Sequence, residues 1–454
     1  MAFHIPQEVV DLCVDHLASD MKDNLDLKCD VRQALLFCSQ VSRSISHRAR
    51  QHLFQRIRLT SRRKGLQALK LHDIMNENPQ FRSYIRSVEI NVNVDDGADK
   101  AATTASRLPE ILNMLTDTNS RRKGVHAFRI HATTNCLPWS KLSNEFLSAL
   151  LKLIHGNTTQ PESNDSKMLK SLHISGFREV PVAVITNCIS SLRDLDIQFL
   201  SFVEAPPAIR LTRPRTRAAK ANQPLDLLPP ASPSFRLNKY HFTGLLRGNI
   251  NELSTHLLQS GAFSCLKDLE IFPFESSDTK FVCDVVELAK TTLESLKLHM
   301  TPAMAPLLGV PAIDLCQLPL LRIVKIVAFI LGRIPSRYPT FSLFDLETKT
   351  TTSSLEVFEL ILGVTTDERT ELAIYSSDHR WDRLDQYLTS SRFPKLRQVD
   401  LKIQIMIFAQ LTDIRKTAVK KKIDEEFRTN LPLLYSSDTI TLNIGINIVK
   451  DWNY

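Results

Sequence analysis

The chain contains 454 residues, of which 43% are hydrophobic and 23% are charged, and its formal net charge is +8. This composition is typical of a folded protein that is long enough for two domains or for one repeat array. Its 12 glycines are too far apart for a dinucleotide-binding or phosphate-binding loop, and no apolar run reaches membrane-spanning length. The eight cysteines form no C-x-x-C pair and the N-terminus resembles no secretory signal, so we expect reduced, buried thiols and a cytoplasmic or nuclear location.

The first sixty residues predict three short helices. Each helix is indicated by apolar residues at helical spacing: Val9, Val10, Cys13, Val14 and Leu17; Val31, Leu35 and Cys38; and Ile45, Ala49, Leu53 and Ile57. Pro6 suits the first position of the first helix, and Ser42 or Ser44 is placed to cap the third. Helices this short cannot bury a self-sufficient core, so the residual apolar surface at Ile5, Pro6, Val9 and Val41 is best explained by a partner.

Three motifs stand out within this stretch. They are I-P-x-E-V from Ile5 to Val9, C-S-x-V-S-R from Cys38 to Arg43, and H-L-F-x-R-I from His52 to Ile57. Together they resemble an F-box, and the last is similar to the F-box-like proteins common in mushroom-forming fungi. Two features depart from the family. The insert from Ser19 to Cys29 is longer than usual and is expected to be a surface loop, and Phe54 stands where many F-boxes carry tryptophan.

The resemblance implies a domain over about residues 1–60 that docks on a Skp-type adaptor and, through it, on a cullin. Carried over to this sequence, it implies adaptor contacts at Ile5, Pro6, Glu8, Val9, Val10, Val14, Leu17, Val41, Ser42 and Arg43. The alternative is a generic three-helix cap on the domain that follows.

From Ile85 onward a six-residue pattern, apolar-x-x-apolar-x-apolar, recurs along the chain. Copies begin at Ile85, Val125, Leu169, Leu192, Leu237, Leu266, Leu293, Leu321, Leu355 and Leu396, and a related alternation follows Ile440. Several successive copies are about 23 to 29 residues apart, as in leucine-rich repeats, whereas other intervals are longer. Segments of helical period lie between copies, at 108–115, 147–154, 250–257 and 381–388.

These features predict an α/β protein in which an irregular leucine-rich-repeat-like solenoid of strand-loop-helix units covers residues 61–454. The alternative is a leucine-rich α/β domain with a chance pattern. Residues 204–235 are rich in proline and arginine and have no period, so they are predicted to be an exposed insertion.

Basic residues gather at 43–64, 210–220 and 415–422. A basic chain can bind nucleic acid, but no aromatic residues interleave with these clusters as base stacking requires. Solvated helix faces and loops explain them better, and a basic nuclear or nucleic-acid-associated protein is kept as an alternative. We expect no membrane partner.

We predict no catalytic residue, no metal ligand and no cofactor, because no comparable constellation of side chains occurs. Polar and charged residues instead occupy the x between the last two apolar positions of the repeats: Glu89, His173, Asp196, Glu270, Lys297, Glu359 and Asp400. In a leucine-rich horseshoe these residues point to the concave face, where a surface of mixed sign suits recognition of a protein target. With the F-box resemblance, this implies a non-catalytic substrate-recognition subunit of a Skp–cullin–F-box type ubiquitin ligase. A scaffold that acts without ubiquitination is the alternative.

Overall fold

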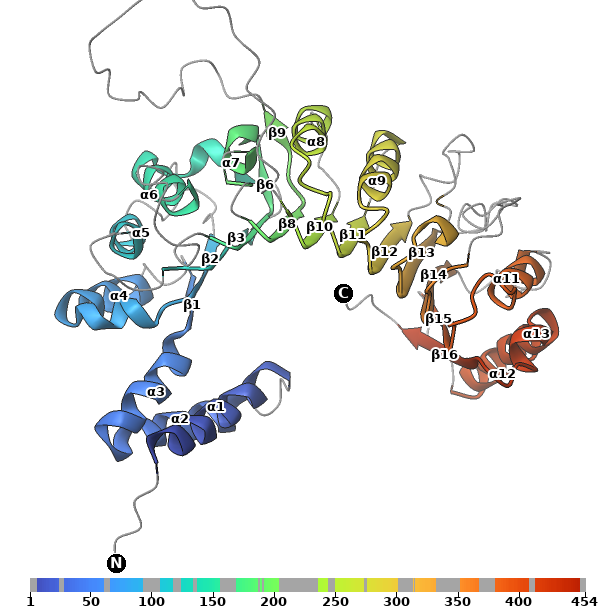
Figure 1. Ribbon diagram of the computed structural model, residues 1–454, viewed down its shortest axis with the longest axis horizontal. Helices are drawn as coiled ribbons and strands as arrows, with labels where there is room; N and C mark the ends of the chain where they lie inside the picture. The colour runs from blue at the N-terminus through green and yellow to red at the C-terminus, as the bar shows by residue number, and fades with distance from the viewer. Residues whose placement is uncertain are drawn as a thin grey trace, which may run out of the picture. The chain divides into compact units, whose positions relative to one another are not determined.

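A computed structural model shows how the chain folds (Figure 1). The residues it describes are 6–23, 28–60, 66–92, 107–116, 124–133, 137–155, 169–186, 188–189, 192–203, 236–243, 250–272, 276–300, 313, 315–331, 352–366, 380–407 and 413–449. They belong to two units, one built mainly from residues 1–192 and the other mainly from residues 249–454. Ile5 and the predicted insertion at 204–235 lie outside the described residues.

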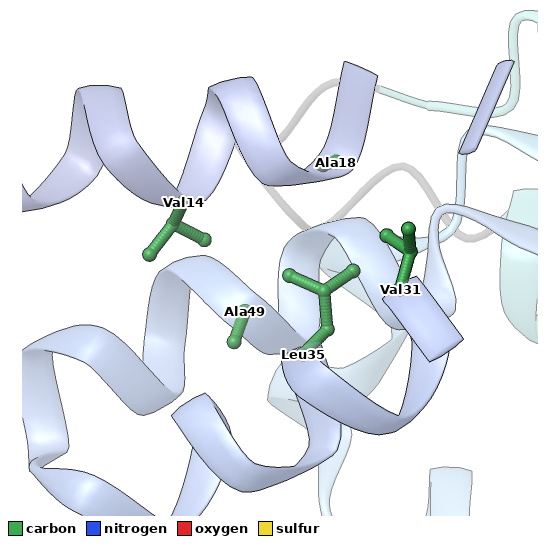
Figure 2. Packing of buried hydrophobic residues seen from close by; sticks show 5 residues of the cluster. All are labelled: Val14, Ala18, Val31, Leu35 and Ala49. Carbon is green, nitrogen blue, oxygen red and sulfur yellow. The ribbon is translucent and has the colours of Figure 1, made fainter. Parts of the chain in front are cut away.

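The predicted three-helix segment at the N-terminus is confirmed. It consists of α1 (Gln7–Asp23), α2 (Lys28–Val41) and α3 (Arg43–Phe54). Figure 2 shows the side chains that form its core: Val14, Ala18, Val31, Leu35 and Ala49. Leu35 and Ala49 are completely buried, and Leu17, Cys38, Ile45 and Leu53 pack around them. This core is small, as expected for helices of this length.

Two boundaries in this segment differ from the sequence expectation. The third helix ends at Phe54, and Ile57 lies in strand β1 (Arg56–Thr60) because the alternating sequence R-I-R-L-T pairs in parallel with β2 (Ser87–Val92). Within the predicted loop at 19–29, the described residues 19–23 and 28–29 are helical, and α1 continues to Asp23 through residues that include neither glycine nor proline.

The repeat motifs form the strands of one parallel sheet, in chain order. After β1 and β2, its strands are β3 (Ala127–Ala132), β5 (Ser171–Ser175), β8 (Asp194–Gln198), β10 (Lys239–Thr243), β11 (Asp268–Phe272), β12 (Ser295–Met300), β13 (Ile323–Leu331), β14 (Val357–Thr366), β15 (Gln398–Ile407) and β16 (Thr441–Val449). Within the described residues the sheet has 12 strands, and the predicted strand-helix repeat is confirmed.

Helices cover one face of the sheet in each unit (Figure 1). They are α4 (Leu66–Glu77), α5 (Leu108–Thr116), α6 (Asn144–His155), α7 (Val182–Thr186), α8 (Ile250–Gln259), α9 (Ser276–Leu288), α11 (Arg380–Leu388), α12 (Asp413–Asn430) and α13 (Pro432–Tyr435), with short 3-10 helices η1 (Pro79–Tyr84), η2 (Trp139–Lys141) and η5 (Leu315–Gln317). Four of these helices, α5, α6, α8 and α11, correspond to the predicted segments of helical period.

The apolar positions of the repeat motif form the core of each unit. The first residue of every copy, from Ile85 to Leu396, is buried just before its strand. The fourth and sixth positions are stacked by the strand register, for example Leu269 on Leu296 and Ile271 on Leu298. The residue between them points to the other face, because side chains alternate along a strand. We call this other face, which the helices leave uncovered, the open face.

Further short strands join the loops of the N-terminal unit. β4 (Leu137–Pro138) pairs with β6 (Phe177–Arg178), and β7 (Val180–Pro181) pairs with β9 (Phe202–Val203). No helix in the described residues is long and apolar enough to cross a membrane. Cys188 and Cys316 are buried as expected, whereas Cys13 is exposed on α1.

Candidate protein-interaction surfaces

Large apolar side chains are exposed on the first two helices. Val9 and Leu12 on α1 are 50% and 72% exposed, and Phe37 and Val41 on α2 are 60% and 69% exposed. In each pair the residues are three or four positions apart, so they lie on the same side of their helix. Single exposed apolar residues are common, but several in one short helical segment indicate a contact surface.

The residues that the F-box resemblance assigned to adaptor contact divide into two groups. Those exposed are Pro6, Glu8, Val9, Val41, Ser42 and Arg43, and Val10 is half-buried. Val14 is only 5% exposed inside the helical core, and Leu17 packs against that core. Val14 and Leu17 therefore lie on the core-facing side of α1 in this arrangement, whereas the resemblance implies adaptor contacts at both.

Sequence reasoning missed three exposed residues of this surface, Leu12, Leu36 and Phe37. It assigned a single apolar stripe to α1, whereas the helix has two. One stripe faces the core through Val14 and Ala18, and the other faces outward through Val9 and Leu12. The sequence contains the signal for both stripes, because the apolar residues of this helix are spread over more than one of its sides. Such a spread predicts that the helix packs against more than one surface.

A carboxylate on α1 connects it to α3. The Arg48 guanidinium donates to both oxygens of Asp15, from Nε at 2.6 Å and from Nη2 at 2.5 Å, and His52 Nε2 lies 2.8 Å from Asp15 Oδ1. The hydrogen bond from Arg48 outweighs the opposing effect of burial, and the pKa of Asp15 falls to about 2. Ser42 also acts as predicted, since its Oγ accepts a hydrogen bond from the Ile45 N–H at 3.3 Å and caps α3.

The helical segment packs against the beginning of the repeat array. Phe54 and Phe81 have ring centroids 4.5 Å apart, and His47 Nδ1 lies 3.0 Å from the Tyr84 hydroxyl. Phe54 thus fills an internal contact. These contacts hold α3 at the start of the sheet and leave the outward sides of α1 and α2 uncovered in the described residues.

On the open face of the N-terminal unit, one row of side chains follows the register of the strands. Glu89 pairs with Arg58 on one side and with Arg129 on the other, and Arg129 pairs with His173. The Glu89 carboxylate is bound by Arg56 at 2.7 Å and by Arg58 at 2.8 Å. Burial alone would raise the pKa of Glu89, but these arginines lower it below its usual value.

The C-terminal unit has a corresponding row. The strand register places these residues side by side: His241, Glu270, Lys297, Lys325, Glu359, Asp400 and Asn443. Asp196 lies at the start of this row, with its Oδ1 atom 3.1 Å from His241 Nδ1. Within each unit, the residues that the sequence assigned to the target-binding face therefore lie side by side on the open face.

The carboxylates in this second row are already held by neighbouring strands. Glu270 receives hydrogen bonds from Lys297 and, at 3.2 Å, from His299. Burial opposes ionisation of Glu270, but these bonds outweigh it and its pKa falls to about 2. Glu359 lies 2.9 Å from Lys325 and 2.6 Å from Lys402. The face is therefore a ladder of internal ion pairs rather than a field of one sign.

Several residues of the basic clusters are paired within the chain in the described residues. Arg48, Arg56 and Arg58 from the first cluster are paired with carboxylates of the same chain. The second cluster lies outside the described residues, and much of the third is on α12, where Lys421 is 3.7 Å from Glu425. This pairing gives little support to nucleic-acid binding, which needs cations that face a phosphate backbone.

Comparisons of the chain with models of protein families and with curated proteins gave no match. Within the described residues, no cluster of three or more His, Cys, Asp or Glu side chains could hold a metal ion. The candidate functional surfaces are therefore the exposed helical surface and the open face of the sheet.

Proposed function

We propose that this protein is a substrate-recognition subunit of a Skp–cullin–F-box type ubiquitin ligase. The observation that carries the proposal is the exposure of Val9, Leu12, Phe37 and Val41 on an N-terminal three-helix segment whose motifs resemble an F-box. A Skp-type adaptor would cover these side chains, and a cullin would follow through the adaptor. The protein itself would supply no chemistry. It would hold a target near the ubiquitin-loaded enzyme and raise the effective concentration of the reacting groups.

The proposed target surface is the open face of the sheet. Its rows of mixed charge, from Glu89 to His173 in one unit and from Asp196 to Asp400 in the other, are arranged by the strand register. Such rows favour a partner whose charges match them in sequence, because a mismatched partner would place like charges opposite each other. This surface would select a protein target, and the helical segment would deliver it to the ligase.

The adaptor contact is tested by co-purification of the full chain with a Skp-type adaptor. Replacement of Pro6→Ala together with Val9→Glu places a charge in the proposed contact and should abolish co-purification, with the repeat array still folded by circular dichroism. Leu66→Glu is the matched control, because Leu66 is 56% exposed but lies on α4, away from the proposed contact. Co-purification that survives the Pro6/Val9 change, or that is lost equally in the control, would overturn the proposal.

The scaffold alternative is separated from the ligase proposal by the next partner. A complete ligase would carry a cullin in the purified adaptor complex and would ubiquitinate a captured target in vitro. A scaffold would retain the adaptor without either. Mass spectrometry of partners that bind only in the presence of an intact helical surface would identify the target in both cases.

A further inference from the structure

Strand β16 is the last strand of the sheet. It pairs with β15 along its whole length, and no strand of the described residues pairs with its other edge. Proteins usually protect such edges with charged residues, proline or short strands. The first strand, β1, follows this rule with five residues that include Arg56 and Arg58. In contrast, β16 has nine residues and contains neither a charged residue nor a proline.

The backbone groups of β16 alternate between its neighbour and the unpaired edge. The Thr441 N–H donates to the Arg397 carbonyl at 2.8 Å, so Thr441 and every second residue after it face β15. The residues between them direct their N–H and C=O groups to the unpaired edge. These edge-facing residues are Leu442, Ile444, Ile446 and Ile448.

The sequence of β16 is symmetric about Gly445. Ile444 and Ile446 flank it, Asn443 and Asn447 follow, and the aliphatic pair Leu442 and Ile448 lies next outward. If two copies of β16 pair antiparallel around a two-fold axis at Gly445, each residue from Leu442 to Ile448 lies opposite a residue of the same kind. Edge-facing residues then meet edge-facing residues, so their backbone N–H and C=O groups bond across the axis. Symmetric dimers require such self-complementary surfaces.

The side chains around the axis suit this contact. Ile444 and Ile446 remain half-exposed although their register partners on β15, Leu401 and Ile403, are buried, so a second copy would complete their burial. Gly445 brings no side chain to the axis, where the two backbones approach most closely. On the open face, Asn443 would lie opposite Asn447 of the other copy, and their amide groups can exchange a hydrogen bond.

We propose that the chain forms a two-fold symmetric homodimer through antiparallel pairing of β16 with β16 of a second copy, centred on Gly445. The second copy is favoured over an unrelated strand because a copy of this strand carries the matching order of isoleucine and asparagine around a glycine. Since β16 has no charge, two copies also meet without like-charge repulsion. The dimer joins two sheets into one and places the open faces of both copies on the same side of it.

The experiment measures the mass of the full chain by sedimentation velocity at micromolar concentrations. Two double variants change the same two positions. Asn443→Lys with Asn447→Lys places lysine opposite lysine at both symmetric positions, and we expect a monomer. Asn443→Lys with Asn447→Glu places lysine opposite glutamate at both positions, and we expect a dimer. Ile444→Pro removes an edge-facing N–H but no bond to β15, and we expect a monomer that is folded by circular dichroism.

Each result decides the proposal. A dimeric wild-type chain, a monomeric lysine-lysine variant and a dimeric lysine-glutamate variant would support pairing in this register. A monomeric wild-type chain would overturn it. So would a lysine-lysine variant that stays dimeric, because the dimer would then use another surface. A lysine-glutamate variant as monomeric as the lysine-lysine variant would overturn the register centred on Gly445.

Discussion

Two neighbouring positions on α2 provide a sharp test of which side of the helix binds the adaptor. Leu35 is completely buried in the helical core, whereas Phe37, two residues further on, is 60% exposed. Replacement of each by alanine should therefore have opposite consequences. Phe37→Ala should weaken adaptor binding and leave the helices stable. Leu35→Ala should loosen the helices, and it should weaken binding only through that loss of structure.

The magnitudes follow from the exposed fractions. A phenylalanine side chain offers about 200 Å² of surface, so the 60% that is exposed amounts to about 120 Å². At about 25 cal/mol per Å², and allowing for the area that alanine retains, covering this surface contributes about 2 kcal/mol, or about a 30-fold change in Kd. The same substitution should change stability by less than about 0.5 kcal/mol. Leu35→Ala should destabilise the helical segment by about 2 to 5 kcal/mol.

Binding is measured by calorimetry with a Skp-type adaptor, and local stability by hydrogen exchange of the amides of α1 to α3. Exchange is preferred to a melting temperature because the helical segment is a small part of a long chain and can open locally. Leu320→Ala is the control, since Leu320 is 49% exposed in the other unit. An unchanged Kd for Phe37→Ala would refute the assignment of this side of α2 to the adaptor. Faster exchange in that variant would refute the claim that Phe37 is dispensable for folding.

Three further substitutions test the structural reasoning. Asp15 has a folded pKa of about 2 against an ordinary 3.8, so its ion pair stabilises the helices above about pH 4, and this stabilisation is lost as the pH falls from about 4 to about 2. Because the carboxylate is 39% exposed, solvent screening reduces the stabilisation to about 1 kcal/mol. Asp15→Asn should remove that pH dependence from hydrogen exchange in α1, and an unchanged acid profile would contradict it. Gly176→Ala should lower the free energy of unfolding in urea by about 2 to 4 kcal/mol, because Gly176 has a φ of +77° and an added Cβ would lie 2.7 Å from the Ala132 carbonyl oxygen. A decrease of less than about 0.5 kcal/mol would show that the loop relaxes freely. Asp385→Ala should lower the free energy of unfolding in urea by about 2 to 4 kcal/mol and speed hydrogen exchange in α13. The reason is that the buried carboxylate accepts hydrogen bonds from two backbone N–H groups of α13, each at 2.8 Å. Unaltered hydrogen exchange would mean that water replaces the carboxylate.

The strands of the array were predictable because each copy of the motif buries the same positions. Leu266, Leu269 and Ile271 are all buried, and the same is true of Leu293, Leu296 and Leu298 in the next copy. The period of two inside the motif and the helical period between copies are local signals, so they survive irregular spacing. The open-face residues followed from the same alternation, which fixes the face of every residue once one is known.

Other features depended on contacts that a local pattern does not contain. Strand β1 was missed because R-I-R-L-T is short and continues the apolar spacing of the helix before it, and only its pairing with β2 settles its conformation. The outward stripe of α1 was missed because apolar spacing does not say which side meets α2 and α3. The buried role of Asp385 was missed because its partners, the N–H groups of α13, lie almost fifty residues away.

The internal pairing on the open face bears on how a target would be recognised there. A basic group on a target that approached Glu270 or Glu359 would have to displace the lysines that already bind these carboxylates. The gain from the new ion pair would then be offset by the loss of an existing one, so these rows contribute little affinity by charge alone. They still discriminate, because a wrong partner loses the internal pair and gains nothing. Affinity for a target should therefore come from apolar and polar contacts along the strands, while the paired charges decide which targets are rejected.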